Sequence, residues 1–403
     1  EGPKTEILYA CMTEEAKRMH PAGPSRLWRK YCRSGFLRGI PLPEWMKSMS
    51  KKKGLWNLFK NGGFFILLLL VTFYFIFRSQ DMGSVLRTVT EVNPIYIGIA
   101  IGCMCLFICC EAINIERTLT LYRCDTSFAK CVKYALTGFF FSSITPMASG
   151  GQPAQMYYMY RDHLEISYSA LAIMMELASF QFITVMMAIF GYMVNFSFFN
   201  EMGYHIQYIL LAGVLLNTVI LGLILMAFFS KTILEKCING LFALLKLFHV
   251  KKIEEIRIKV QYQIDLYRRG AAAFQKNKGT VTKILLTTLV QITAFHSIPF
   301  WIYRAFGYEE YSFMTVLLIQ AVLYITVSAI PLPGSVGASE SGFILIFHTL
   351  FPAQVIQSAM LLSRGISFYL FLCISGIFLL VIHALYRGKT RERTQPMKIR
   401  KIH

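Results

Sequence analysis

Nine stretches of the sequence carry no charged residue over 16 to 29 positions, and they constrain the fold more than any other feature. A helix needs about 20 predominantly apolar residues to cross a bilayer, so each stretch is a candidate membrane segment. The sequence therefore predicts an all-α protein, a polytopic bundle of transmembrane helices. The stretches are residues 62–77, 92–110, 134–160, 177–200, 202–230, 284–303, 311–339, 341–363 and 365–386.

Composition supports this class and excludes others. Only 16% of the residues are charged and 55% are hydrophobic, whereas soluble domains carry about 25% charged residues. The net charge is nevertheless +19. A soluble enzyme, a disordered chain or a nucleic-acid-binding domain would not combine this charge with long uncharged runs. The ten cysteines form no Cys-x-x-Cys pair and no nucleotide-binding or metalloprotease motif occurs, so we expect no metal and no cofactor.

The positive charge is concentrated in three blocks, and these blocks predict the orientation. Residues 1–60, 231–283 and 387–403 have net charges of +8, +8 and +6. Basic segments beside membrane helices stay in the cytoplasm and attract anionic lipid headgroups. We therefore expect a multi-pass protein of the cell membrane with both termini cytoplasmic. The connections 195–205 and 304–312 carry an excess of acidic residues and are expected outside.

The same blocks suggest the domain organisation. Residues 1–54 form a basic N-terminal extension, and the part before Met49 could be a leader, because Met49 followed by Ser-Lys-Lys-Lys resembles a natural start. Residues 55–386 form the membrane domain, and 387–403 form a basic tail. Apolar residues three and four apart predict an amphipathic helix over 251–278, inside the cytoplasmic segment 231–283. That helix would lie at the membrane interface or pack on the bundle.

Counting membrane crossings predicts two unusual segments. With the basic blocks inside, residues 131–166 must enter and leave on the cytoplasmic side, and 313–352 on the outer side. Each segment is interrupted at its middle by Pro, Gly and Ser. We predict two opposed re-entrant hairpins made of broken helices. When the two segments are aligned, Ser143 matches Ser328 and Pro146 matches Pro331, which suggests an inverted repeat with its site at mid-membrane.

The two interruptions carry the motifs Thr145-Pro146-x-x-x-Gly150-Gly151-Gln152-Pro153 and Pro331-x-Pro333-Gly334-x-x-Gly337-x-Ser339-Glu340. In this order and spacing they resemble the signature segments of the flippase-like membrane family. That family is also called the lysylphosphatidylglycerol synthase transmembrane region. The resemblance covers roughly residues 55–386. One departure is Ser335, where the family often has a second consecutive glycine.

The resemblance implies a lipid-related activity. Some family members carry a C-terminal domain that transfers an amino acid from aminoacyl-tRNA to phosphatidylglycerol, and their membrane part moves the product lipid outward. The family name implies phosphatidylglycerol lysyltransferase activity, lipid metabolism and antibiotic resistance. The stretch after Tyr386, residues 387–403, is too short for such a catalytic domain, so we expect none here. The resemblance then favours a translocase for a phospholipid such as aminoacylated phosphatidylglycerol.

The candidate substrate-binding residues lie at the two interruptions and on the helices beside them. The glycines of the first interruption would expose backbone N–H groups to a lipid phosphate, or would serve only to turn the chain. Glu340 would cap the helix that follows it, or pair with Arg364, whose guanidinium could bind a phosphate. Glu176 needs a partner from another helix. The full set is Thr145, Pro146, Gly150, Gly151, Gln152, Glu176, Pro331, Gly334, Gly337, Ser339, Glu340 and Arg364.

Other polar residues have more ordinary interpretations. Glu111 and Glu116 are expected to pair near the surface with Arg117. His296 is expected to make a hydrogen bond between helices, and Pro299 to kink its helix. The connection formed by Asp162, His163 and Glu165 is expected to be solvated rather than to bind a metal.

Alternatives to a lipid translocase remain open at this stage. One is the lysyltransferase enzyme itself, and another is an ion-coupled transporter of small solutes. A third is a membrane partner that scaffolds a lipid-modifying enzyme without transport. The sequence also leaves a homo-oligomer possible and identifies neither the lipid nor the coupling ion.

Overall fold

The computed structural model describes residues 92–229, 266–328, 330 and 332–392. Within these ranges the chain forms helices and no strand, which confirms the predicted all-α class. Five helices of the described part are long and apolar enough to cross a membrane, so this is an integral membrane protein. They cover Pro94–Leu121, Ile166–Val194, Gln207–Met226, Lys278–Ala305 and Ile356–Ile382. The predicted segment 62–77 and most of the amphipathic segment lie outside the described residues.

Two long helices organise the bundle. Helix α6 (Pro94–Leu121) begins at Asn93, whose side chain accepts the N–H of Ile95, and it packs against α14 (Lys278–His296), α15 (Ile298–Ala305) and α9 (Ile166–Val194). Helix α9 in turn packs against α11 (Tyr204–Phe229) and α16 (Phe313–Ser328). A short helix, α10 (Phe196–Glu201), joins α9 to α11. The break between α14 and α15 falls at Ser297, just before Pro299, and confirms the predicted kink.

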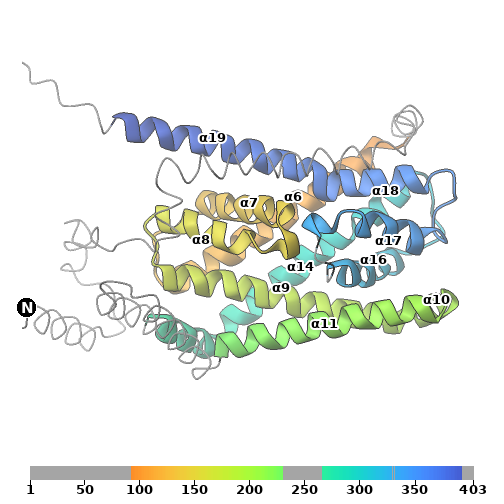
Figure 1. The fold of residues 1–403 in the computed structure, drawn as a ribbon, viewed down its shortest axis with the longest axis horizontal. Helices are drawn as coiled ribbons and strands as arrows, with labels where there is room; N and C mark the ends of the chain where they lie inside the picture. The colour runs from red at the N-terminus through yellow and green to blue at the C-terminus, as the bar shows by residue number, and fades with distance from the viewer. Residues whose placement is uncertain (1–91, 230–265, 329, 331, 393–403) are drawn as a thin grey trace, which may run out of the picture. The chain divides into compact units, whose positions relative to one another are not determined.

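The first interrupted segment forms a helical hairpin. Helix α7 (Phe128–Ile144) ends in a 3-10 turn, η2 (Pro146–Ala148), and the chain returns as α8 (Gly151–Arg161), side by side with α7 (Figure 1). Proline starts the turn because its fixed φ suits a first helical position and it lacks the N–H that the preceding helix would need. The hairpin is observed, and its re-entrant placement in a membrane stays a prediction.

The second interrupted segment forms a similar hairpin from α16, the 3-10 turn η3 (Pro333–Ser335) and α17 (Ala338–Phe347). The two turns η2 and η3 contact each other, and η3 also contacts α7. The expected meeting of the two hairpin ends is therefore present in the helix packing. The stretch 341–363 is not one helix, because α17 ends at Phe347 and a loop containing Pro352 separates it from α18 (Ile356–Arg364).

The last helix is continuous but irregular. Helix α18 leads into a π-helical segment, η4 (Gly365–Leu370), and then into α19 (Phe371–Glu392). Short π-helical insertions inside α-helices are rare and frequently mark functional sites. Here the insertion directly follows Arg364, and the side chain of Phe368 within it lies against Gly334 of the second turn.

Candidate functional site

The first turn is closed by the hydroxyl of Thr145. Its Oγ1 donates to the carbonyl of Phe141 at 2.6 Å and accepts the N–H of Gly150 at 2.9 Å. The left-handed backbone conformation needed to reverse the chain falls on Met147 and Ala148, with φ of 53° and 54°. The neighbouring glycines, Gly150 and Gly151, have right-handed or helical backbone, so they are not needed to turn the hairpin.

Those glycines are needed for close packing. A Cβ on Gly151 would lie 2.9 Å from the carbonyl oxygen of Gly138 and 2.0 Å from the hydroxyl of Ser142, both on α7. A Cβ on Gly150 would lie 2.6 Å from the methyl group of Thr145. Gln152 follows at the start of α8 and is half-buried, whereas residues 146–149 are exposed. The turn is therefore exposed, and it is supported by the close packing of α7 against α8.

The second turn is organised by the carboxylate of Glu340, which is only 6% exposed. Its Oε2 accepts the N–H of Gly337 at 2.6 Å and so caps α17. Its Oε1 accepts from Nε of Arg364 at 3.0 Å and from the hydroxyl of Tyr369 at 3.1 Å. Both interpretations of Glu340 are correct, since it caps its helix and pairs with Arg364. Ser339 beside it is buried.

Arg364 is held on two sides. Its Nη2 donates to the carbonyl of Gly334 at 3.0 Å, and its guanidinium lies 4.6 Å from the ring centroid of Phe368. Only 14% of its side chain is exposed. Its remaining nitrogen, Nη1, makes no hydrogen bond to any residue within the described ranges. The two N–H groups of Nη1 on this fixed cation are therefore left for another acceptor.

Both turns and the π-helical segment converge at Gly334. A Cβ there would lie 2.2 Å from Cζ of Phe368 and 3.2 Å from the carbonyl oxygen of Ser143 at the end of α7. We call this convergence the turn junction, defined by residues 145–152, residues 334–340 and Arg364. It gathers the predicted residues of both motifs except Pro331, which lies outside the described residues. The role of these residues in substrate binding stays a prediction.

The two turns share a backbone conformation, but in a different register from the one predicted. Thr145 and Leu332 are extended, Pro146 and Pro333 begin a 3-10 turn, and two left-handed residues follow each proline. The next helices begin after Gly150 and Gly337. Pro146 therefore corresponds to Pro333, and matching it with Pro331 was wrong. More residues separate the preceding helix from the turn in the second hairpin than in the first. Sequence matching alone therefore aligned Pro146 with the earlier of the two prolines, Pro331.

Glu176 lies away from the turn junction, in a polar region between helices. Both of its carboxylate oxygens are enclosed and form no well-aligned hydrogen bond within the described ranges, although the amide side chains of Asn114 on α6 and Gln291 on α14 lie beside them. Glu111 on α6 interacts electrostatically with Glu176 and accepts from Nε2 of Gln155 on α8 at 2.8 Å. We call Glu111 and Glu176 the carboxylate pair.

The expected surface pairing of Glu111 with Arg117 is wrong. Arg117 instead donates to Thr287 and to the carbonyl of Lys283, both at 2.9 Å, and to Asn114 at 3.3 Å. The guanidinium lies further along α6 than Glu111, and the start of α14 offers it neutral acceptors. The groups beside Glu176 come from other helices, as predicted, but the sequence does not identify Glu111 or Gln155 among them.

Comparison with known proteins supports the resemblance carried by the two turns. Residues 62–375 match the family model described as the lysylphosphatidylglycerol synthase TM region. The chain belongs to this family. A UPF0104 membrane protein from Archaeoglobus fulgidus is 26% identical to it over 247 residues, which are 60% of this chain and 73% of that protein.

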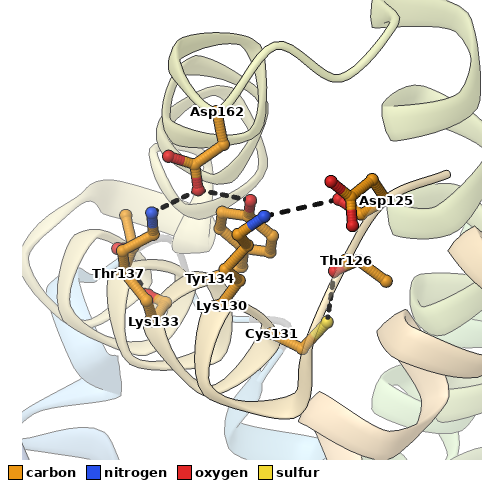
Figure 2. Close-up of polar contacts among 8 residues, drawn as sticks. All are labelled: Asp125, Thr126, Lys130, Cys131, Lys133, Tyr134, Thr137 and Asp162. Atoms are coloured by element: carbon orange, nitrogen blue, oxygen red, sulfur yellow. Dashed lines mark hydrogen bonds and ion pairs between the residues drawn. The ribbon is translucent and has the colours of Figure 1, made fainter. Parts of the chain in front are cut away.

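The base of the first hairpin is also polar. Figure 2 shows the carboxylate of Asp162, just after α8, between Lys133 and Tyr134 in the first turns of α7. Asp162 forms an ion pair with Lys133 and accepts the hydroxyl of Tyr134 at 2.5 Å. The expected solvation of this connection is wrong for Asp162, whose side chain is only 10% exposed. His163 is exposed as expected.

The expected interhelical hydrogen bond of His296 is also not found. Its side chain is fully buried, and neither ring nitrogen has a hydrogen-bond partner in the part of the chain that the structure covers. The ring packs instead against Phe295 and Tyr324, with centroid distances of 5.6 and 5.1 Å. No group of three or more metal-ligating side chains occurs in the part of the chain that the structure describes.

Proposed function

We propose that the protein moves a phospholipid, such as aminoacylated phosphatidylglycerol or a related polar lipid, between the two leaflets of the cell membrane. Membership of the lysylphosphatidylglycerol synthase TM family gives this integral membrane protein a lipid-related role. The observation that carries the more specific proposal is Arg364. It is a fixed cation whose Nη1 has no hydrogen-bond partner among the described residues, at the point where two broken helices meet.

The electrostatics of the turn junction favour an anionic headgroup. Helices α8 and α17 both begin there, and a helix N-terminus carries about half a positive charge from its unpaired N–H groups. Arg364 contributes a full charge, which Glu340 offsets. The remaining positive potential would stabilise a phosphate, and Nη1 of Arg364 could donate a charge-assisted hydrogen bond to a phosphate oxygen.

The surroundings of the turn junction suit a headgroup better than a whole lipid. Arg364 offers a charged contact there, whereas Met147 of the first turn and the length of α11, including Leu211, Leu215 and Leu223, expose apolar side chains. A headgroup at the turn junction with its acyl chains left in the bilayer would avoid the cost of burying those chains in protein. Such a path needs no nucleotide, so transport would follow a lipid or ion gradient.

The proposal is tested in proteoliposomes containing fluorescent phosphatidylglycerol, or its aminoacylated form, with chemical quenching of the outer leaflet. Removing a charge-assisted hydrogen bond costs about 1.5–3 kcal/mol, so Arg364→Gln should slow translocation by roughly 10- to 100-fold. The translocation rate of Arg364→Lys should fall between those of Arg364→Gln and the wild type, because lysine keeps the positive charge but lacks the planar set of guanidinium N–H donors. The matched control is Arg304→Gln, since Arg304 pairs with the exposed Glu309 near a helix end.

Each variant is first checked for folding by its thermal melting profile. A folded Arg364→Gln protein that translocates both lipids at the wild-type rate would contradict the proposal. Transport of a small anion without lipid movement would instead support the solute-transporter alternative.

A further inference from the structure

The carboxylate pair lies inside the bundle at matched depth. Glu176 is ten residues after the start of α9, and Glu111 is ten residues before the end of α6, so each lies about 15 Å along its helix. These two helix ends are on the same side, because Tyr122 and Tyr168 stack there with ring centroids 4.8 Å apart. The two carboxyl groups therefore lie at a similar depth, well away from the helix ends, and interact electrostatically.

The surroundings of the pair supply amides and hydroxyls rather than a cation. Helix α6 contributes Asn114 and Cys110, α8 contributes Gln155, α9 contributes Ser179, and α14 contributes Thr288 and Gln291. Helix α7 presents Gly138, which has no side chain. Arg117 is the nearest guanidinium on these helices and is bonded to Asn114, Thr287 and a carbonyl. Among the described residues, neither carboxylate has a basic partner.

A second observation comes from Gln291, which is 1% exposed. Its side chain lies beside Glu176, yet its Oε1 accepts no hydrogen bond from the described residues. The amides of Gln291 and Asn114 lie near the oxygens of Glu176 but form no well-aligned hydrogen bond with them. Buried polar groups without such bonds are unfavourable. A proton on Glu176 would give the carboxyl group an O–H that could donate to Oε1 of Gln291.

A low-dielectric site cannot hold two adjacent carboxylates in the charged state without a counter-charge. We propose that Glu111 and Glu176 form a proton-binding site that holds one proton, carried by Glu176 and influenced by the charge on Glu111. A metal ion fits less well, because one oxygen of Glu111 already accepts from an amide nitrogen and a hard cation takes six or more oxygen ligands. Cys110 on α6 is a further titratable group that interacts with Glu176, and His296 on the same helix as Gln291 packs against Tyr324 of α16.

The site has a direct connection to the turn junction. Gln155, which donates to Glu111, lies one helical turn after Gly151, where α8 begins. A change of charge on Glu111 alters the strength of this hydrogen bond and so the position of α8 relative to α6. This step rests on the proposed function and makes the proton gradient the energy source for translocation.

The first experiment does not involve lipid transport. The purified protein in nanodiscs is titrated while the infrared carbonyl band of protonated carboxyl groups is recorded. We expect a titrating band in the wild type, its loss in Glu176→Gln, and a shifted midpoint in Glu111→Gln. Glu116→Gln on the same helix is the control and should keep the wild-type band. An unchanged band in both pair variants, or a midpoint displaced by Na⁺ at constant ionic strength, would overturn the proposal.

The second experiment measures lipid translocation in proteoliposomes with and without an imposed pH gradient. The wild type and Glu116→Gln should respond to the gradient, whereas Glu176→Gln should not. A wild-type protein that titrates in the infrared but moves no lipid would refute the proposed function and leave the proton site standing. A wild type that moves lipid with no response to the gradient, and without a titrating band, would refute the proton site alone.

Discussion

At the scale of single residues, an absent side chain decides how the first hairpin is connected to the rest of the bundle. A Cβ on Gly138 would lie 2.1 Å from Nε2 of Gln155. The space above Gly138 is therefore the space through which Gln155 passes from α8 to reach Glu111 on α6. The sequence shows Gly138 only as a glycine inside an apolar helix, and the hydrogen bond that requires it spans 44 residues of chain.

Gly138→Ala is expected to disconnect Gln155 from Glu111 without unfolding the protein. The clash involves the flexible end of Gln155, so that side chain will move and its hydrogen bond, worth about 0.5–1.5 kcal/mol, will be lost. This loss offsets the gain of up to about 1 kcal/mol from replacing a helical glycine. Thermal melting should thus change little, while the translocation rate falls.

The control for this substitution is Gly102→Ala on α6, where no atom would lie within 4 Å of the new Cβ. It should keep the wild-type translocation rate. Equal rates for the two alanine variants would show that the connection through Gln155 has no part in transport.

At the scale of whole elements, glycines mark the crossings of helices. A Cβ on Gly191 of α9 would lie 2.8 Å from the carbonyl oxygen of Leu318 on α16, and one on Gly213 of α11 would lie 2.7 Å from Cα of Thr326 on α16. Small residues allow close approach where membrane helices pack. Helix α16, the first arm of the second hairpin, is therefore held between two helices by backbone contacts.

Gly213→Ala should separate α11 from α16 and lower the melting temperature. The new methyl group meets backbone atoms that cannot rotate away, and such overpacking costs about 1–3 kcal/mol. The control lies on the same helix, because a Cβ on Gly222 would meet nothing within 4 Å. If Gly213→Ala and Gly222→Ala melt at the same temperature, the α11–α16 crossing is looser than described.

The π-helical segment also acts at this scale, by bringing two residues to one carboxylate. In a π-helix residue i bonds residue i+5, so side chains five positions apart share a face. Arg364 and Tyr369 are five apart, and both donate to Oε1 of Glu340. A regular α-helix would turn them to different sides. The sequence suggested the pairing of Arg364 with Glu340 because both are charges beside apolar runs, but nothing in it indicates the irregular turn or the third partner.

At the scale of the molecule, the sequence predicted more of the fold than of the site. Uncharged runs and interrupted segments predicted the helical class and both hairpins, since burial of backbone in a membrane leaves few other structures. Glu176 was predicted to need a partner from another helix, but Glu111, Gln155 and the Asp162 cluster were missed, because their contacts depend on which helix faces meet. The predicted alignment of Pro146 with Pro331 was also wrong, because a turn motif does not fix the number of residues that precede the turn.

The orientation in the membrane is a prediction at this scale, and impermeant thiol reagents can test it. In a background without accessible native cysteines, single cysteines at Glu201 and Glu310 should react in intact cells, because the acid-leaning connections are expected outside. A cysteine introduced in the tail 387–403 should react only after permeabilisation. The reverse pattern would place the basic blocks outside and invert both hairpins.

The tie between Asp162 and the start of α7 has a mechanical consequence. The first hairpin is clamped at its open end by Lys133 and Tyr134, and its arms touch through backbone at Gly151 further along. Two helices held together at both ends cannot separate easily. The hairpin is therefore expected to tilt as one rigid unit, so that a displacement of its turn is accompanied by a displacement of its open end, where Asp162 lies.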